Sequence, residues 1–389
     1  MRKQHFRIGI VALGMLLSVS VYGQKGERVE SITVVMKTEN WYKEQAALWQ
    51  KEVEKNNKNA EAWHNYYAAT RALKLMAESP EEADKYAKKC HEIADEAIAK
   101  IPETFEGNHI YWWDGNNEKA RDKYLFKAYQ INPNDPRAYD ELLVVHEIER
   151  NTAEFERMAK KMVEANVLPA GILNWGYNVL SELDQNAIVF TAGDNDTYAL
   201  WLTQSVFGVR KDVRVFNIYL FYAVPEYREK CLKELMITNF QSPKPDDKEA
   251  MAKCLNELVR VVGNKKPIYV SGSANSCLEL FDEKDSFYLT GLSYKYAVES
   301  FDNISLIRRN YEHRYKLDYL DIQFTTHISD EIAAQFDALY LPSLIKLYCH
   351  YEVSEEAQKR DNALALIKVI AKRTGREEIV ESLLKSGKN

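Results

Sequence analysis

The spacing of apolar residues changes after Asp184. From about Asn40 to Asp184 apolar residues recur at helical spacing. Ala187-Ile188-Val189-Phe190 is then a continuous apolar run, which is typical of a strand buried on both faces. Strand and helix patterns alternate up to 298, and helical spacing returns at 299–389. The predicted fold class is therefore α/β plus all-α: a helical array at 24–184, an α/β module at 185–298 and helical hairpins at 299–389.

The helical array contains similar segment ends. The segments 96–102, 127–133 and 161–167 close alike, and 31 residues separate Pro102 from Pro133. A large aromatic residue stands six positions after two such ends, Trp63 after Asn57 and Tyr139 after Pro133. This pattern resembles the tetratricopeptide repeat, and it predicts three to four divergent repeats. Such arrays offer a concave surface to a protein or peptide, which is the favoured interpretation; the alternative is that this one supports the module that follows it.

One stretch of the array departs from the repeat pattern. It carries the aromatic residues Tyr111, Trp112 and Trp113, and it leaves little room for a normal first helix. The three side chains are candidates for a partner-binding patch. The alternative is that they fill the core, as aromatic clusters commonly do.

The α/β module is predicted to be a Rossmann-like parallel sheet. Strands are expected at 187–190, 213–218 and 267–270, with a fourth at 287–289, and helices at 197–207, 226–237 and 248–262. Ligands of open parallel sheets bind at the carboxyl ends of the strands. The candidate ligand-binding residues at these ends are Asp194, Asn195, Asp196, Thr197, Asn217, Ser271 and Ser273.

Two of these residues, Asp194 and Asp196, are spaced as a DxD pair. Such a pair can hold a divalent cation through carboxylate oxygens. Asp and Asn before a helix also cap the free amides of its first turn, so capping and cation binding both remain open. The sequence has no GxGxxG and no P-loop, and no organic cofactor is predicted.

The segment 190–217 has a distinctive sequence. It reads Gly193-Asp-Asn-Asp-Thr197, then Leu200-Trp201, then a Gly208-Val-Arg-Lys-Asp-Val-Arg-Val215 strand that leads to Asn217. It resembles the soluble C-terminal region of Bacteroidota membrane proteins similar to protein O-mannosyltransferases. In such proteins glycosyl transfer is expected of the membrane-embedded part, which this chain lacks. The resemblance therefore implies a helper or recognition module of the cell envelope.

The C-terminal segment is predicted to contain a helix at 328–335, an antiparallel helix pair at 341–351 and 354–373, and a short final helix. A basic run at 307–316 is interpreted as a solvated helix face, or as a contact for an anionic partner. The five cysteines show no metal-ligand spacing, and a Cys231–Cys254 disulfide is one option.

The first 23 residues have the pattern of a signal peptide. Basic residues precede a 14-residue apolar run at 8–21, and cleavage is expected near Gly23. Losing three basic residues takes the formal charge from −6 to −9, which argues against binding nucleic acid. The mature chain is expected to be periplasmic and to have no transmembrane segment.

The sequence is therefore consistent with two functions. The first is an exported scaffold that binds an envelope protein or peptide and catalyses nothing itself. The alternative is a glycan-related enzyme, or a glycan- or metal-binding module, that uses the Asp194-Asn195-Asp196 run.

Overall fold

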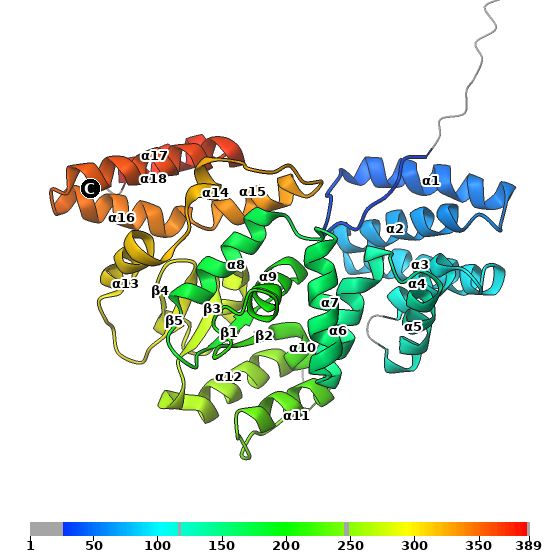
Figure 1. Cartoon of the computed structure of the whole chain (residues 1–389), viewed down its shortest axis with the longest axis horizontal. Coiled ribbons are helices and arrows are strands. Elements are labelled where there is room, and N and C mark those ends of the chain that lie inside the picture. Colours follow the sequence, from blue (N-terminus) through cyan, green and yellow to red (C-terminus); the bar gives the residue numbers. More distant parts are fainter. Residues whose placement is uncertain (1–25, 116–117, 245–248, 387–389) are drawn as a thin grey trace, which may run out of the picture.

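The computed structural model describes residues 26–115, 118–244 and 249–386, and it is mostly helical (Figure 1). The predicted signal peptide lies outside the described residues. Among the described residues, no helix is both long enough and apolar enough to cross a membrane.

The first part of the chain is a series of helices, most of which pack on the next helix in the sequence. An extended segment at 26–38, here called the N-terminal strap, precedes them. The helices are α1 (Glu39–Lys55), α2 (Ala60–Met76), α3 (Pro80–Lys100), α4 (Phe105–Asp114), α5 (Asp122–Ile131), α6 (Tyr139–Glu149), α7 (Thr152–Glu164) and α8 (Ala170–Glu182). The stretch at Tyr111 is thus a helix of its own, α4, where little room for one was predicted.

One hydrogen bond recurs near the starts of three helices. Trp63 Nε1 donates to the carbonyl oxygen of Asn57 at 3.0 Å, and Tyr139 Oη donates to that of Pro133 at 3.2 Å. Asn108 Nδ2 makes the same six-residue contact with the carbonyl oxygen of Pro102, at 2.8 Å. The three positions therefore play equivalent roles, while assignment to the tetratricopeptide class stays a prediction.

The central module is built on one five-stranded sheet. Its strands run in the order β2-β1-β3-β5-β4. The elements are β1 (Ile188–Thr191), α9 (Asp194–Ser205), β2 (Arg214–Asn217), α10 (Ile218–Ala223), α11 (Pro225–Glu234), α12 (Ala250–Val262), β3 (Ile268–Ser271), β4 (Phe287–Leu289) and β5 (Ser293–Tyr296).

The sheet is mixed, which corrects the prediction of a wholly parallel sheet. β1 pairs in parallel with β2 and β3, but β5 is antiparallel to both β3 and β4. Only three residues, Thr290 to Leu292, join β4 to β5. A parallel pair needs a crossover of about a dozen residues, so this short connection forces an antiparallel hairpin. β5 was not predicted from the sequence.

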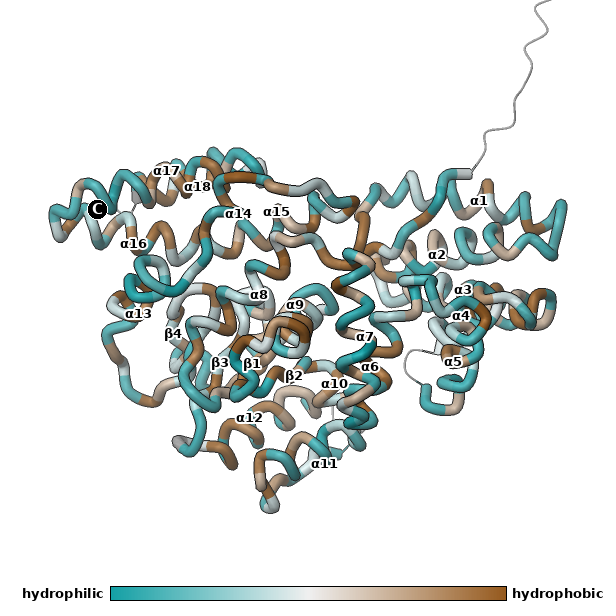
Figure 2. The backbone as a smooth tube through the Cα atoms, in the orientation of Figure 1, coloured by the Kyte–Doolittle hydropathy of each residue, from teal (hydrophilic) through white to brown (hydrophobic). Residues whose placement is uncertain are grey.

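Alternate residues of the strands pack on opposite faces of the sheet. Val189, Val215 and Tyr269 belong to a hydrophobic cluster that includes α8, α9 and C-terminal helices. Ile188, Phe190, Phe216, Ile268 and Val270 pack instead against α10, α11 and α12. Figure 2 shows the strands and α12 carrying brown, hydrophobic segments, and Figure 1 shows α11 and α12 beneath the sheet.

The C-terminal part contains α13 (Asn303–Arg309), a π-helical turn (Asn310–Arg314), α14 (Asp318–Asp321), α15 (Asp330–Ala338), α16 (Leu341–Val353), α17 (Ala357–Thr374) and α18 (Glu377–Ser386). The predicted antiparallel pair corresponds to α16 and α17, which pack on each other. Gly375 ends α17 in the left-handed conformation, with φ of +63°.

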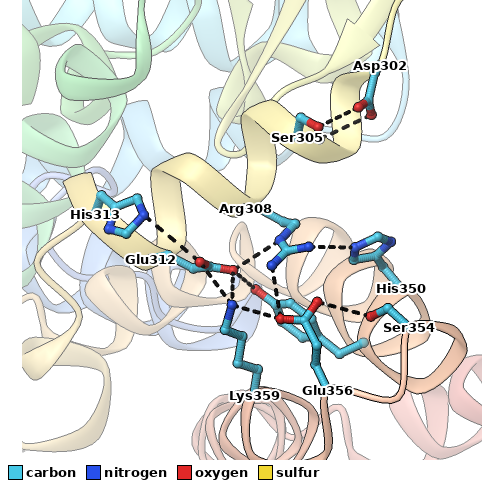
Figure 3. A network of polar contacts seen from close by, with 10 residues as sticks. Asp302, Ser305, Arg308, Glu312, His313, His350, Ser354, Glu356 and Lys359 are labelled. Atoms are coloured by element: carbon cyan, nitrogen blue, oxygen red, sulfur yellow. Dashed lines mark hydrogen bonds and ion pairs between the residues drawn. The ribbon is translucent and has the colours of Figure 1, made fainter.

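The basic run at 307–316 takes part in an ion-pair network (Figure 3). Arg308 pairs with Glu312 at 3.1 Å and with Glu356 at 3.0 Å, and Lys359 pairs with both carboxylates. These contacts neutralise part of the run and join α13 to α17. They leave less positive charge for an anionic partner than the sequence suggested.

All five cysteines are free, so the Cys231–Cys254 disulfide is not formed. Burial raises the pKa of Cys231 to about 12 and that of Cys254 to about 11. Both thiols therefore stay protonated and act as small buried apolar groups.

Candidate functional site

The Gly193–Thr197 run forms the first turn of α9, whereas the sequence placed it in a loop before a helix at 197. Asp196 is buried, with 2% exposure, and its carboxylate accepts four hydrogen bonds. The donors are the backbone amides of Ala192, Gly193 and Thr197 and the hydroxyl of Ser273, at 2.6–3.0 Å. A carboxylate has about four lone-pair positions, so these donors occupy it fully.

The other predicted residues of this edge mostly bind one another. The side chain of Thr197 donates to the carbonyl oxygen of Gly193, and Asn217 donates to the Thr197 hydroxyl at 3.0 Å. Asn217 Oδ1 also accepts from two amides of α10, and the hydroxyls of Ser271 and Ser273 lie 2.8 Å apart. The carboxyl ends of β1, β2 and β3 therefore bring these residues together as expected, but largely in a closed local network.

Asn195 and Asp194 point away from that network. Asn195 Nδ2 donates to the carbonyl oxygen of Thr33 at 2.9 Å and so anchors the N-terminal strap to α9. Asp194 lines a cavity of about 440 Å³. It is exposed to this cavity, yet protein surrounds its carboxyl group, and that desolvation raises its pKa.

The cavity lies where the helical array meets the α/β module. Its walls come from the strap, the array helices α2, α4 and α6, and the starts of α9 and α10. The charged side chains that line it are Arg28, Glu30, Arg71, Arg137, Asp140, Glu141 and Asp194. The aromatic and imidazole side chains are His64, His109, Trp112, Trp113, Tyr198, Trp201, Tyr219 and His327.

Three carboxyl groups, those of Asp140, Glu141 and Asp194, influence one another across this cavity. Burial, then the charge of Asp194, raises the pKa of Asp140 to about 7. Burial and the neighbouring Asp140 likewise hold the pKa of Glu141 well above its usual range. Arg71 opposes these shifts, and its guanidinium lies 4.5 Å from the ring centre of Trp113.

The three aromatic residues of α4 do not form one patch. Trp112 is buried in the core, where its Nε1 donates to Asp122 at 3.1 Å. Trp113 lines the cavity beside His64 and His109, whereas Tyr111 packs against Tyr124 and Arg121. Of these three residues, Trp113 is therefore the one that both lines the cavity and is partly exposed.

The residues on the array side of the cavity were not predicted from the sequence. Asp140, Glu141, Arg71, His64 and His109 lie far from Asp194 in sequence, and no motif marks them. A paired Asp-Glu at a helix start reads equally well as favourable first-turn charge. Within the described ranges, no group of three or more His, Cys, Asp or Glu residues is arranged to hold a metal ion.

A protein-family model, TMEM260-associated domain 2, matches residues 172–227. The match extends from α8 through β1, α9 and β2 to the beginning of α11, and so includes the Gly193–Thr197 turn. TMEM260 is a protein O-mannosyltransferase-like family, which agrees at a coarse level with the resemblance in the sequence. No curated protein matches the chain.

Proposed function

We propose that the chain is an exported envelope interaction protein that binds a segment of a protein or peptide partner in the cavity between array and module. The observation that carries this proposal is the composition of the cavity wall, which comes from the strap, three array helices and the start of α9. Clefts where such units meet are common binding sites. The matched family segment supplies one wall, which supports a recognition role for it.

Blocking the cavity tests this proposal. Ser31 lies half-buried on the strap at the cavity wall, so Ser31→Trp would fill the space with an indole. Ser276, which is exposed and outside the cavity lining, provides the matched control Ser276→Trp. Pull-down from envelope extracts is expected to recover a stoichiometric partner with the wild type and the control, and to lose it with Ser31→Trp. Equal recovery by all three proteins would contradict the proposal.

The second candidate is a glycan-related enzyme or glycan-binding module that uses Asp194. This candidate is supported because one cavity contains both aromatic rings and carboxyl groups whose pKa values are raised. Because four donors occupy Asp196, a cation would be held by Asp194 without its DxD partner. Calorimetry with Mn²⁺, Mg²⁺ and Ca²⁺ is the test: a heat of binding lost in Asp194→Asn would favour this candidate, and no heat with any of the cations would remove its metal-dependent form.

A further inference from the structure

The charged side chains that line the cavity are four acids and three arginines. Arg28 pairs with Glu30 at 2.7 Å, and Arg137 pairs with Asp135 and Glu106 at 2.6 and 2.9 Å. These pairs account for two of the three arginines in the lining. The third, Arg71, lies over the ring of Trp113 in the same lining, and its charge lowers the pKa values of Asp140, Glu141 and Asp194.

None of these three carboxyl groups forms a salt bridge with another residue that the structure describes. Burial, and then the charges of all three carboxyl groups, raise the pKa of Tyr198 well above its usual range, so Tyr198 stays a neutral hydroxyl and offers no charge. When all three carboxyl groups are ionised, their charges and that of the Arg71 guanidinium sum to about −2 in a desolvated space. A cationic group bound there would reduce this unfavourable charge.

The cavity lining also includes side chains with buried polar atoms that have no partners. His64 is 7% exposed and His109 is 2% exposed, and both line the cavity. His64 Nε2 and His109 Nδ1 have no hydrogen-bond partner among the described residues. Burial lowers the pKa of His109 to about 4 and that of His64 well below its usual range, so both rings are neutral near pH 7. Neither ring therefore adds positive charge to the cavity.

Two exposed apolar side chains lie at the same cavity. Ile328 is 61% exposed and Tyr219 is 51% exposed, and both belong to the lining. Exposed apolar groups around a polar interior favour a ligand that has apolar side chains next to its charge.

We propose that the cavity receives a lysine or arginine side chain of a polypeptide, with the acidic group formed by Asp140, Glu141 and Asp194 contacting its cationic end. This inference rests on the proposed function, since it names the chemistry of the segment that the cavity binds. The flanking apolar residues of that segment lie at Ile328 and Tyr219, and the neutral rings of His64 and His109 form part of the wall beside it.

A random heptapeptide library displayed on phage tests the inference on the full-length protein. Selection on the wild type is expected to enrich Lys or Arg next to apolar residues, because only a cation is stabilised by the acidic group. Synthetic peptides of the enriched sequence should bind at least tenfold more weakly when norleucine replaces the basic residue, as measured by calorimetry. Enrichment of acidic or uncharged peptides, or no enrichment, would overturn the inference.

The double variant Glu141→Gln/Asp194→Asn removes two of the ionisable carboxyl groups and keeps the side-chain shapes. It is expected to weaken the selected peptide at least tenfold without lowering the melting temperature, because it relieves repulsion between buried acids. Asp95→Asn, an exposed site on α3, is the matched control and should bind normally. Since Asp140 must ionise, affinity for the peptide should increase as the pH rises through about 7.

Two further outcomes separate the alternatives. A glucosamine trimer that binds more tightly than the selected peptide would overturn the inference in favour of an amino sugar. If Ser31→Trp abolishes partner capture but the double variant captures the partner fully, the inference fails and the proposed function stands. If Ser31→Trp captures the partner as the wild type does, the proposed function fails.

Discussion

Asp194 and Asp196 are two residues apart in one helical turn, and their surroundings give them different roles. Asp196 accepts four hydrogen bonds and holds the start of α9 against β1 and Ser273. Asp194 faces the cavity. The sequence could predict that Asp, Asn and Ser residues gather at this edge of the sheet, because strand ends meet there. It could not predict which carboxylate is used for the fold, since that depends on side-chain direction.

The same substitution at the two positions should separate these roles. Asp196→Asn replaces an acceptor oxygen by an amide group that cannot accept, so at least one buried donor loses its partner. Each such loss costs about 1–3 kcal/mol, and urea unfolding should show a decrease of about that size. Asp194→Asn should leave the free energy of unfolding unchanged or slightly higher. A larger loss at Asp194 than at Asp196 would contradict this assignment.

At the scale of elements, Glu182 joins α8 to the β4–β5 hairpin. It accepts hydrogen bonds from the amide of Leu292 at 2.9 Å and from the hydroxyls of Ser293 and Tyr315. Gly291, in the hairpin turn, has φ of +154°, and a Cβ there would lie 2.3 Å from Glu182 Oε2. The sequence predicted β4 from its apolar run. It did not predict β5, because Ser293-Tyr-Lys-Tyr296 is polar, half-buried and held by this long-range contact.

Glu182 should make stability depend on pH. Burial raises its pKa from 4.5 to about 7. Between these values the folded carboxyl keeps a proton that the unfolded one releases, so its stabilising contribution is complete below pH 4.5 and is lost as the pH rises through 7. The loss is up to about 3 kcal/mol.

Glu182→Gln imitates the protonated form and removes this dependence. The free energy of unfolding of the variant, measured with urea, should therefore increase relative to that of the wild type between pH 5 and 8. Glu312 is a suitable control because its pKa is lowered below 4.5. Glu312→Gln should show no such gain above pH 5. Parallel pH profiles for Glu182→Gln and the wild type would contradict the expectation.

At the scale of the whole molecule, the hydrophobic core crosses the segment boundaries suggested by the sequence. One cluster extends from Phe105 in α4 to Val380 in α18 and includes α6 and α7 together with α8 and α9. Phe155 of α7 lies edge-to-face on Trp201 of α9, with ring centres 5.8 Å apart. Periodicity predicted strands at β1 to β4 but neither β5 nor α10, and it holds no information on which helix faces cover one another.

This shared core leads to a prediction for fragments. A chain of residues 24–184 would keep the cluster of α1, α2, α3 and the strap but would expose the faces of α6 and α7 that pack on α9. We expect it to bind an apolar-sensing dye and to unfold with low cooperativity, whereas the full chain binds little dye and unfolds cooperatively. A fragment that is dye-free and cooperative would indicate that the array folds independently.

The order of the strands also has a consequence for how the chain acquires its fold as it is synthesised. β1 is central in the parallel part and pairs with β2 and with β3, which is about 80 residues further along the chain. The helices before it are built from neighbouring contacts and can form as soon as they emerge, because local contacts form quickly. Until the residues of β3, Ile268 to Ser271, have been synthesised, one edge of β1 is unpaired and the side chain of Phe190 is incompletely buried. The nascent chain therefore passes through a stage with a half-built sheet, at which a chaperone that binds extended apolar segments would find its target.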